Sequence, residues 1–524
     1  MDLVPILDNT SALSLEKRRL KDTESEYFAM VHVGEKIARE ILSDFRELKP
    51  VPENLSVLAL VGKGKNGGDC LLTCDYLMRA LPRAKVHVIL LSAESTLDPL
   101  CKKAFKEVEQ RFRVHVIGED FDQESFPKVL DAMVAEYGSI NLCLDGLYGL
   151  GFRLPLEASV AQLLELVNAY DEIDVRASVD IPSGLSQGDE TCFFRSDFSY
   201  MAGTAKQVFF SLNAAIGRVR FIDIGLYDEQ VLLENEGREH YLCPTYLKQL
   251  SCLRPSNVEK RSFGHLFILG GSQFMPGALL MTVQAAIQSG VGLVTVFAPG
   301  SIVPTLSAQV PEAIWIALPE TVVGTINTNA GDIILEKIAS ATAIVLGPGL
   351  GSNRETEFVV QQLVNRANIP IVLDADALMP GVLESIHKRK SIGSNQIILT
   401  PHMGEFLRMF KLSKVNLETK AFLSLIKTMD VTVVLKGAIT RICDGEQLLL
   451  SSQGGPVLSR GGSGDMLAGI IGSRIAQKNI DLMTAAALGV LIHGCAAEHL
   501  AREQGQIFVR TTDLLKYLPK VIRL

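Results

Sequence analysis

The stretch from Arg460 to Gln477 reads RGGSGDMLAGIIGSRIAQ and joins a glycine turn to an apolar helical pattern. Residues Gly461 to Gly464 form a turn that bulky side chains would obstruct. A glycine turn that opens a helix presents backbone N–H groups at the positive end of the helix dipole, where phosphate is the commonest ligand. We therefore predict a phosphate site here, around which the rest of the chain is organised.

Asp465 directly follows this turn, where the helix dipole favours its ionised form. Because like charges repel, a carboxylate beside a phosphate site does not serve to bind phosphate. Its expected task is to take a proton from a hydroxyl group that is about to be phosphorylated. The alternative is an aspartate that caps the helix, and the stretch by itself does not separate the two roles.

Length and composition bound the class of protein. The 524 residues are too many for one ordinary core, and 47% hydrophobic with 21% charged residues indicates a globular chain of two large domains. A net charge of −8 argues against a nucleic-acid or anionic-membrane partner. The nine scattered cysteines contain no CxxC pair, and no signal pattern or apolar run of about 20 residues occurs. We therefore expect a cytoplasmic protein.

The first half begins a doubly wound sheet. A buried strand is predicted over Ser56 to Val61, followed by GKGKNGGDC at Gly62 to Cys70 and by a helix from about Leu71 to Leu81. Four further strands are predicted at Lys85 to Leu91, Arg113 to Ile117, Leu142 to Leu144 and Ala177 to Ile181. Open α/β sheets bind ligands in the loops after their strands. The candidate ligand residues in these loops are Asn66, Asp69, Asp145, Asp180 and Ser183, although each aspartate taken singly could be an ordinary loop or cap residue.

A polar stretch from Glu234 to Leu253 places the domain boundary near residue 245, which gives domains 1–245 and 246–524. The second domain alternates strands and helices, which predicts a largely parallel sheet covered on both faces. Its strands are predicted at His265 to Leu269, Gly290 to Ala298, Ala341 to Gly351, Ile369 to Asp376, Gln396 to Glu405 and Thr432 to Thr440, and a helix at Ala278 to Ser289.

Polar residues follow several of these strands. His402 is a candidate ligand contact or an ordinary hydrogen-bonded loop histidine, and Lys436 beside Gly437 suits a phosphate contact. Asp374 and Asp376 suggest magnesium or a general base, although we expect at least one of them to cap the following helix. The chain has no GxxxxGK[ST] pattern, which excludes a Walker-type nucleotide site.

The second half resembles the ribokinase-like dehydratases that repair hydrated NADH and NADPH. The resemblance covers nearly all of residues 260–515 and rests on GHLFILGGSQFMPGALLM, GVGLVTV, LGPGLG, VLDADAL, LTPHMGE, LKGAIT and GGSGDMLAGIIG. The first half resembles the epimerase domain that is found fused to them, over about residues 25–235, through GKGKNGGDC, DGLYGLG, VDIPSG and RFIDIGL. The resemblance implies a Rossmann-like doubly wound sheet followed by a ribokinase-like α/β/α sandwich.

For the second half, the resemblance implies a site for ADP or ATP with Mg²⁺. Asp465 would be the base that acts on the substrate, and Ala278, Gly349 and His402 would contact the hydrated nicotinamide nucleotide. The residues implied in nucleotide binding are Lys436, Gly437, Ala438, Ile439, Thr440, Gly461, Gly462, Ser463 and Gly464.

For the first half, the resemblance implies K⁺ at Asn66, Asp145 and Ser183, with Asp180 as an acid–base group. The implied substrate positions are Lys65, Asn66, Asp69, Gly149, Leu150, Gly151 and Asp180. Three residues depart from the family pattern, because Lys65 replaces an asparagine, Cys70 a glycine and Leu150 a threonine. The charge of Lys65 would weaken a K⁺ site unless the side chain turns away.

Together these residues imply a repair enzyme that dehydrates the S epimer of the hydrate and interconverts the R and S epimers. Two alternatives stay open: a kinase of the same superfamily that acts on a vitamin precursor, and a first domain that binds a nucleotide or protein without catalysis. The expected partners are small molecules and further copies of the chain, which would form a homo-oligomer.

Overall fold

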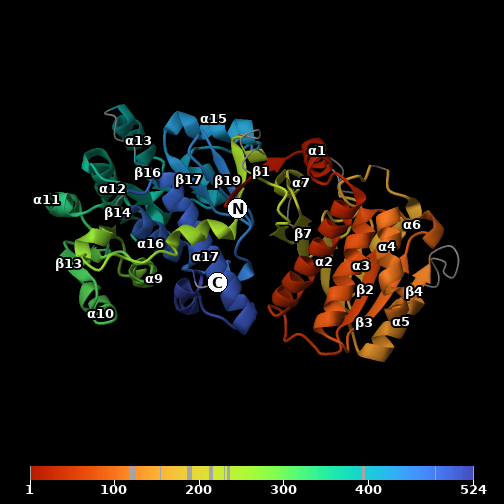
Figure 1. The fold of residues 1–524 in the computed structure, drawn as a ribbon. Coiled ribbons are helices and arrows are strands. Elements are labelled where there is room, and N and C mark those ends of the chain that lie inside the picture. Colours follow the sequence, from red (N-terminus) through yellow and green to blue (C-terminus); the bar gives the residue numbers. More distant parts are fainter. Residues whose placement is uncertain are drawn as a thin grey trace. The chain divides into compact units, whose positions relative to one another are not determined.

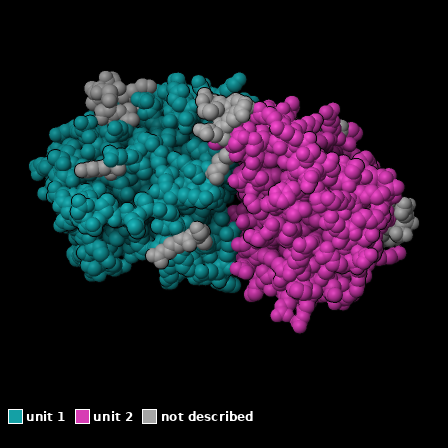
Figure 2. Space-filling view, viewed as in Figure 1, with its two compact units in different colours: residues 1–4, 237–524 teal, residues 5–236 magenta. Residues whose placement is uncertain are grey.

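The computed structural model describes residues 2–116, 126–153, 155–185, 192–211, 216–228, 231–232, 237–391, 396–477 and 479–522. The chain forms two compact units, coloured in Figure 2: a first unit, Pro5–Glu236, and a second unit, Met1–Val4 with Gly237–Leu524. Each unit contains a sheet and helices that pack on it (Figure 1), which confirms the predicted α/β class with two domains. Within the second unit, the Cys243 N–H donates to the Asp2 carbonyl at 3.1 Å, a contact that the sequence did not indicate.

The first unit contains a seven-stranded parallel sheet in the order β4-β3-β2-β5-β6-β7-β9. Its strands are β2 (Ser56–Val61), β3 (Lys85–Leu90), β4 (Arg113–Val116), β5 (Ile140–Gly146), β6 (Ile173–Val179), β7 (Phe198–Ala202) and β9 (Arg218–Ile222). The end of β1 (Leu3–Leu7) pairs with the short β8 (Ala205–Lys206). Its helices are α1 (Asn9–Arg19), α2 (Thr23–Phe45), α3 (Lys65–Ala80), α4 (Pro99–Val108), α5 (Phe126–Tyr137), α6 (Ala158–Ala169) and α7 (Val208–Ser211).

Both faces of this sheet are buried. Val57 and Ala59 of β2 belong to the cluster that α2, α3 and α4 complete, whereas Leu58 and Leu60 pack with α5 and α6. Successive side chains of a strand point to opposite faces, so a continuous apolar run suits a strand that is covered on both sides. The chain continues from β2 and from β5 in opposite directions along the sheet, and open α/β sheets bind ligands at the carboxyl ends of two such strands.

One predicted boundary in this unit is wrong. The helix expected from about Leu71 begins at Lys65, so most of the KNGGDC segment is helical. Two glycines in its first turns allow close packing: a Cβ on Gly67 would lie 2.1 Å from the Gly62 carbonyl oxygen, and one on Gly68 would lie 2.6 Å from Met30 Sδ of α2. Tertiary packing therefore stabilises a helix in a segment whose glycines would by themselves favour a turn.

The second unit holds strands in the order β13-β12-β11-β14-β15-β16-β17-β18-β19-β10. They are β10 (Glu239–Leu242), β11 (His265–Leu269), β12 (Leu293–Pro299), β13 (Ile314–Leu318), β14 (Ala343–Leu346), β15 (Ile371–Leu373), β16 (Ile397–Leu399), β17 (Thr432–Leu435), β18 (Thr440–Cys443) and β19 (Leu448–Ser451). Neighbours from β13 to β17 are parallel, whereas β18 is antiparallel to β17 and β19. The single strand expected over Thr432 to Thr440 is therefore wrong, because the chain reverses after Leu435.

Helices cover both faces of this sheet as well, since Ile268 and Phe267 of β11 are 0% and 1% exposed. The helices are α9 (Pro276–Gln288), α10 (Val303–Ser307), α11 (Ala330–Lys337), α12 (Arg354–Arg366), α13 (Val382–Ser391), α14 (Met403–Met409), α15 (Thr419–Met429), α16 (Ser463–Ile475) and α17 (Leu482–Gln504). Helix α17 is the one described helix that is long and apolar enough to cross a membrane, but 78% of its most apolar window is buried inside the fold, as for a core helix.

Candidate functional site

The glycine turn leads directly into α16. Gly462 caps the helix in the left-handed region at φ 89°, and Ser463, Gly464 and Asp465 are the first three helical residues. The first bond within the helix runs from the Met466 N–H to the Gly462 carbonyl at 3.1 Å. Asp465 is therefore not the helix cap, which removes the structural alternative for this residue. The opening N–H groups are those for which a helix supplies no acceptor, as an anion site requires.

The Asp465 carboxyl group is largely buried. Burial and, after it, the charge of Asp374 raise its pKa to about 6, while the charge of Lys436 opposes this rise. The expectation that the helix dipole favours the ionised form is thus outweighed by burial. The Asp465 carbonyl accepts a hydrogen bond from Thr282 Oγ1 at 3.0 Å, which ties the start of α16 to α9. A carboxyl group with a pKa near neutral pH suits a general base.

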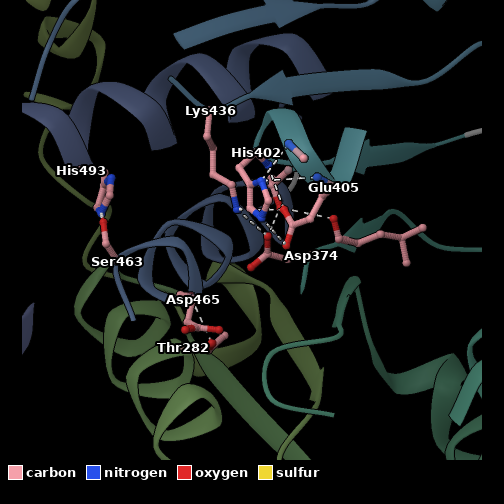
Figure 3. A network of polar contacts seen from close by, with 11 residues as sticks. Thr282, Asp374, His402, Glu405, Lys436, Ser463, Asp465 and His493 are labelled. Carbon is pink, nitrogen blue, oxygen red and sulfur yellow. Dashed lines mark hydrogen bonds and ion pairs between the residues drawn. The ribbon is translucent and has the colours of Figure 1, made fainter. Parts of the chain in front are cut away.

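Lys436 follows β17 and points toward the start of α16 (Figure 3). Its Nζ donates to Asp374 Oδ1 at 3.0 Å and lies 3.9 Å from Glu405 Oε2. A Cβ on Gly464 would lie 3.1 Å from this nitrogen. Burial lowers the pKa of Lys436, but Asp374 and Glu405 raise it above its usual value, so the ammonium group stays charged beside the glycine turn.

Asp374 and Asp376 have separate roles. Asp374 is 1% exposed and accepts hydrogen bonds from Lys436 and from Thr400 Oγ1, the latter at 2.8 Å. It occupies the N-cap position of the 3₁₀ turn that follows but makes no side-chain cap bond to it, so it is not the capping side chain that we expected of at least one of the two aspartates. Asp376 accepts a hydrogen bond from the Gly351 N–H at 2.9 Å. Among the described residues, no group of three His, Cys, Asp or Glu side chains is arranged to hold a metal ion.

His402 caps α14 and remains 60% exposed. Its ring Nδ1 accepts hydrogen bonds from the backbone N–H groups of Gly404 and Glu405 at 3.0 and 3.3 Å. The backbone N–H of His402 donates to Glu405 Oε2 at 2.8 Å. Because Nδ1 accepts, the neutral ring carries its proton on Nε2, 3.5 Å from Glu405 Oε1. His402 is therefore both a hydrogen-bonded loop histidine and an accessible donor.

The other candidate residues of this unit lie beside one another or beside the glycine turn. Gly349 has φ 65°, and a Cβ there would lie 3.0 Å from Ala278 Cβ, so the two predicted substrate contacts adjoin. Gly437 to Ile439 lie in the turn between β17 and β18 beside Lys436, and Thr440 is the first residue of β18. Ser463 Oγ lies 3.3 Å from Nε2 of His493, whose pKa burial lowers to about 4. His493 is thus a neutral partner of the glycine turn that sequence reasoning missed.

In the first unit, Asn66, Asp145 and Ser183 meet at the ends of β2, β5 and β6. Ser183 donates to both Asp145 oxygens, from Oγ at 2.6 Å and from N–H at 2.7 Å. Asn66 Nδ2 donates to the Tyr148 carbonyl at 2.9 Å. Burial raises the pKa of Asp145 to about 6, although the bonds from Ser183 and Leu147 lower it. The three residues are therefore linked through Ser183, which bonds to Asp145 and to the same Tyr148 carbonyl that Asn66 binds.

Asp180 and Lys65 each have a charged partner. Asp180 adopts φ 61° and its Oδ1 lies 2.6 Å from Lys206 Nζ, a partner that the sequence analysis missed. Lys65 Nζ pairs with Glu26 Oε1 of α2 at 2.6 Å, so its charge is partly balanced by a carboxylate of α2.

The remaining predicted substrate positions of the first unit differ in how close they lie to Asn66. Asp69 lies one turn further along α3, and a Cβ on Gly149 would lie 3.3 Å from the Asn66 side chain. Leu150 is partly buried, and a Cβ on Gly151 would meet no described atom within 4 Å. Gly149 is thus held beside Asn66, whereas Gly151 borders open space.

Both halves of the chain match known families. Residues 266–520 match the sequence model described as NAD(P)H-hydrate dehydratase, and residues 27–205 match the YjeF-related protein N-terminus. The chain is 31% identical to the bifunctional NAD(P)H-hydrate repair enzyme of Gloeobacter violaceus, over 90% of this chain and 89% of that protein. The chain belongs to this repair-enzyme family. The proteins of the same description from Moorella thermoacetica and Thermofilum pendens are each 28% identical over 90% and 99% of this chain, and 88% and 95% of their own.

Solved structures that cover about half of the chain are also similar to it. An ADP/ATP-dependent NAD(P)H-hydrate dehydratase from Bacillus subtilis is 26% identical over 54% of this chain and 97% of its own, with a TM-score of 0.45. A hypothetical protein from Streptococcus mutans is 27% identical over 54% of this chain and 98% of its own, with a TM-score of 0.48.

Membership in the repair-enzyme family bears out the resemblance, but several polar residues around its sites were not predicted. Glu405 lies inside the LTPHMGE motif, and its spacing of three residues from His402 is a capping-box signal that could have identified it. His493 lies in the apolar run of α17, and a polar residue there was the available signal. Lys206 carried no signal, since the sequence between β7 and β9 gives no hint of what a lysine there would face.

Proposed function

We propose that the chain repairs hydrated NADH and NADPH, with dehydration in the second unit and exchange of the R and S epimers in the first. Asp465 carries the proposal for the second unit, because a carboxyl group with a pKa of about 6 opens the same helix that presents the phosphate-binding N–H groups. The family match over both halves supports two activities on one chain. It also favours repair over the kinase alternative.

The proposed dehydration uses phosphate as a better leaving group than hydroxide. Asp465 takes the proton of the ring hydroxyl group, whose oxygen attacks the terminal phosphorus of ADP or ATP, and the bond from that phosphorus to the bridging oxygen breaks to release AMP or ADP. The glycine-turn N–H groups and Lys436 stabilise the charge on the transferred phosphoryl group. The lone pair of the ring nitrogen then expels phosphate, and loss of a ring proton restores the double bond.

Different observations support the two proposed ions, Mg²⁺ and K⁺. Mg²⁺ binds through one or two carboxylates and substrate phosphates, and Asp376 at the end of β15 is a fitting donor; the ion would neutralise phosphate charge. K⁺ in the first unit would be held by oxygen atoms of Asn66, Asp145 and Ser183, and the buried Asp145 carboxyl group fits a monovalent cation. It would supply a fixed positive charge there.

The test uses mixed epimers of hydrated NADH with magnesium and either nucleotide, and follows the return of reduced-nicotinamide absorbance. We expect a fast phase from the S epimer and a slower phase as the R epimer is converted. Asp465→Asn should slow the fast phase by about 10²–10⁴-fold, the usual worth of a general base. The exposed Glu312→Gln is the matched control.

Near-normal turnover of Asp465→Asn would contradict the assigned base. A phosphorylated product that accumulates without recovered NADH would instead favour the kinase alternative. A wild-type reaction that stops after the fast phase would contradict the proposed epimerase activity and favour a binding role for the first unit.

A further inference from the structure

A cavity of about 320 Å³ lies in the first unit, on the face of the sheet that α5 and α6 cover. The loops after β2, β3 and β5 line it through Lys63, Ser92 and Tyr148, and α5 and α6 complete its walls. Sites for small molecules have volumes of about 300–1,000 Å³. None of its described lining residues is among the predicted substrate or K⁺ positions, so the cavity has no role in the site described above.

The walls of this cavity suit a flat aromatic ring. Phe126, Val160 and Leu163 form an apolar wall and are buried. The ring of Tyr148 forms another wall and packs against the ring of Phe152, at 4.8 Å between the ring centroids. An aromatic base gains stacking and apolar contact in such a place, whereas a charged group would lose its hydration without an equivalent partner.

Tyr148 joins the cavity to the Asn66, Asp145 and Ser183 positions. Its carbonyl accepts a hydrogen bond from Asn66 Nδ2 at 2.9 Å, and its backbone N–H donates to Ser183 Oγ at 2.9 Å. The same residue thus presents its backbone to these positions and its side chain to the cavity. One elongated ligand is therefore able to occupy both places at once.

The loop after β2 adds a positive charge beside the cavity. Lys63 lines the cavity with an exposed side chain, and it precedes Asn66 by three residues in the same glycine-rich segment. The Lys63 carbonyl accepts a hydrogen bond from the Asp98 N–H at 2.8 Å, which holds this loop against the start of α4. An ammonium group at this point suits a phosphate that links the two halves of a ligand.

Glu157 supplies the opposite charge. It lines the cavity from the start of α6 and is exposed, and its side chain makes no cap bond to that helix. Its carboxylate would repel a phosphate at this end of the cavity. Carboxylates of doubly wound sheets accept hydrogen bonds from ribose hydroxyl groups, so a nucleoside without a phosphate on its ribose ring fits here.

The order of the strands supports the same division. The loops after β2 and β3 line the cavity, whereas Asp145 and Ser183 lie at the ends of β5 and β6, on the other side of β2. Dinucleotides bind doubly wound sheets across the point where the strand order reverses, with one mononucleotide half on each side.

We propose that this cavity binds the adenosine half of the hydrated dinucleotide, with the adenine ring stacked on Tyr148 and the linking phosphates beside Lys63. The assignment rests on the epimerase function proposed above, because that function supplies a substrate with an adenosine half. The hydrated ring then lies toward Asn66 and Ser183. The cavity thus recognises the part of the substrate that does not react.

The test compares two substrates with the full chain. One is the S epimer of hydrated NADH. The other is the S epimer of hydrated reduced nicotinamide mononucleotide, which keeps the reacting ring but has no adenosine. Exchange is followed by chromatographic separation of the R and S forms without ADP or ATP, so that the second unit stays inactive. The wild type should have a higher kcat/KM for hydrated NADH, and this preference is the quantity measured.

Leu166→Trp places a larger side chain in the cavity, which Leu166 lines. It should lower the preference for hydrated NADH about tenfold, because stacking of a base on an aromatic side chain contributes an effect of this size. Glu165→Trp is the matched control, since Glu165 is an exposed neighbour on α6 that does not line the cavity, and it should keep the preference. An equal loss for both substrates in Leu166→Trp, or no loss for either, would overturn the assignment.

Tyr148→Ala is the second variant if Leu166→Trp does not fold. It keeps the backbone bonds to Asn66 and Ser183 but removes the stacking ring, so it should lower the preference about fivefold or more. An unchanged preference in this variant would also overturn the assignment.

Photolabelling with 8-azido-ADP tests the cavity without catalysis. After irradiation and mass spectrometry, we expect label on peptides that contain Tyr148 or α6, and loss of this label in Leu166→Trp. Label confined to the second unit would overturn the assignment. Label in the cavity of a protein that does not catalyse epimer exchange would support the adenosine site and contradict the epimerase function alone.

Discussion

Asp465 must be ionised to accept a proton, and burial beside Asp374 raises its pKa to about 6. We therefore expect the rate of the fast phase to be level above pH 7 and to fall about tenfold for each pH unit below 6, because the protonated carboxyl group cannot act as a base. Lys436 lowers this pKa, so Lys436→Met should move the fall to higher pH as well as weaken nucleotide binding.

The measurement is the pH profile of the fast phase at saturating nucleotide. Lys427→Met is the matched control, because Lys427 is an exposed lysine of the same unit that pairs with Glu446. A Lys436→Met profile with an unmoved acidic limb would show that Lys436 does not act on the charge of Asp465.

At the scale of the element, the geometry of the turn that opens α16 depends on its glycines. Gly462 has φ 89°, where a side chain is strained, and a Cβ there would also meet the Met281 side chain. Gly462→Ala should therefore destabilise the second unit by about 1–2 kcal/mol and displace the N–H groups that face the phosphates. The measurements are denaturant unfolding and the Michaelis constant for ATP.

Gly461→Ala is the control for this element, because a Cβ on Gly461 would meet no described atom within 4 Å and the residue does not need a left-handed backbone. We expect this variant to keep its stability. If both variants behaved alike, the left-handed cap at Gly462 would not be what sets the geometry of the turn.

For the whole molecule, K⁺ should act on the first unit alone. A cation that binds only the folded unit at 100 times its dissociation constant adds about 2.7 kcal/mol of stability. The unfolding transition of the first unit should therefore rise in KCl relative to choline chloride at equal ionic strength, and that of the second unit should not change. In Asn66→Ala this gain should shrink, and an equal gain in both salts would argue against the proposed K⁺ site.

The strands that carry the candidate sites could be predicted because their apolar runs end in polar residues. Strand β2 and strand β11 have the predicted bounds, and Asp465 follows a recognisable turn. The reversal after Leu435 and the helical start of the KNGGDC segment could not be predicted, since both depend on packing partners that are distant in the sequence.

The sequence by itself determined the two α/β units, the glycine turn that opens α16 and the family, because these depend on local patterns and on the order of motifs. Only the tertiary structure decided the charge states at the sites. The pKa of Asp465 depends on burial and on Asp374, which is 91 positions away in the chain. The Lys206–Asp180 pair likewise joins β8 to the loop after β6. Burial and electrostatic interactions act through space, so the linear order of residues does not reveal them.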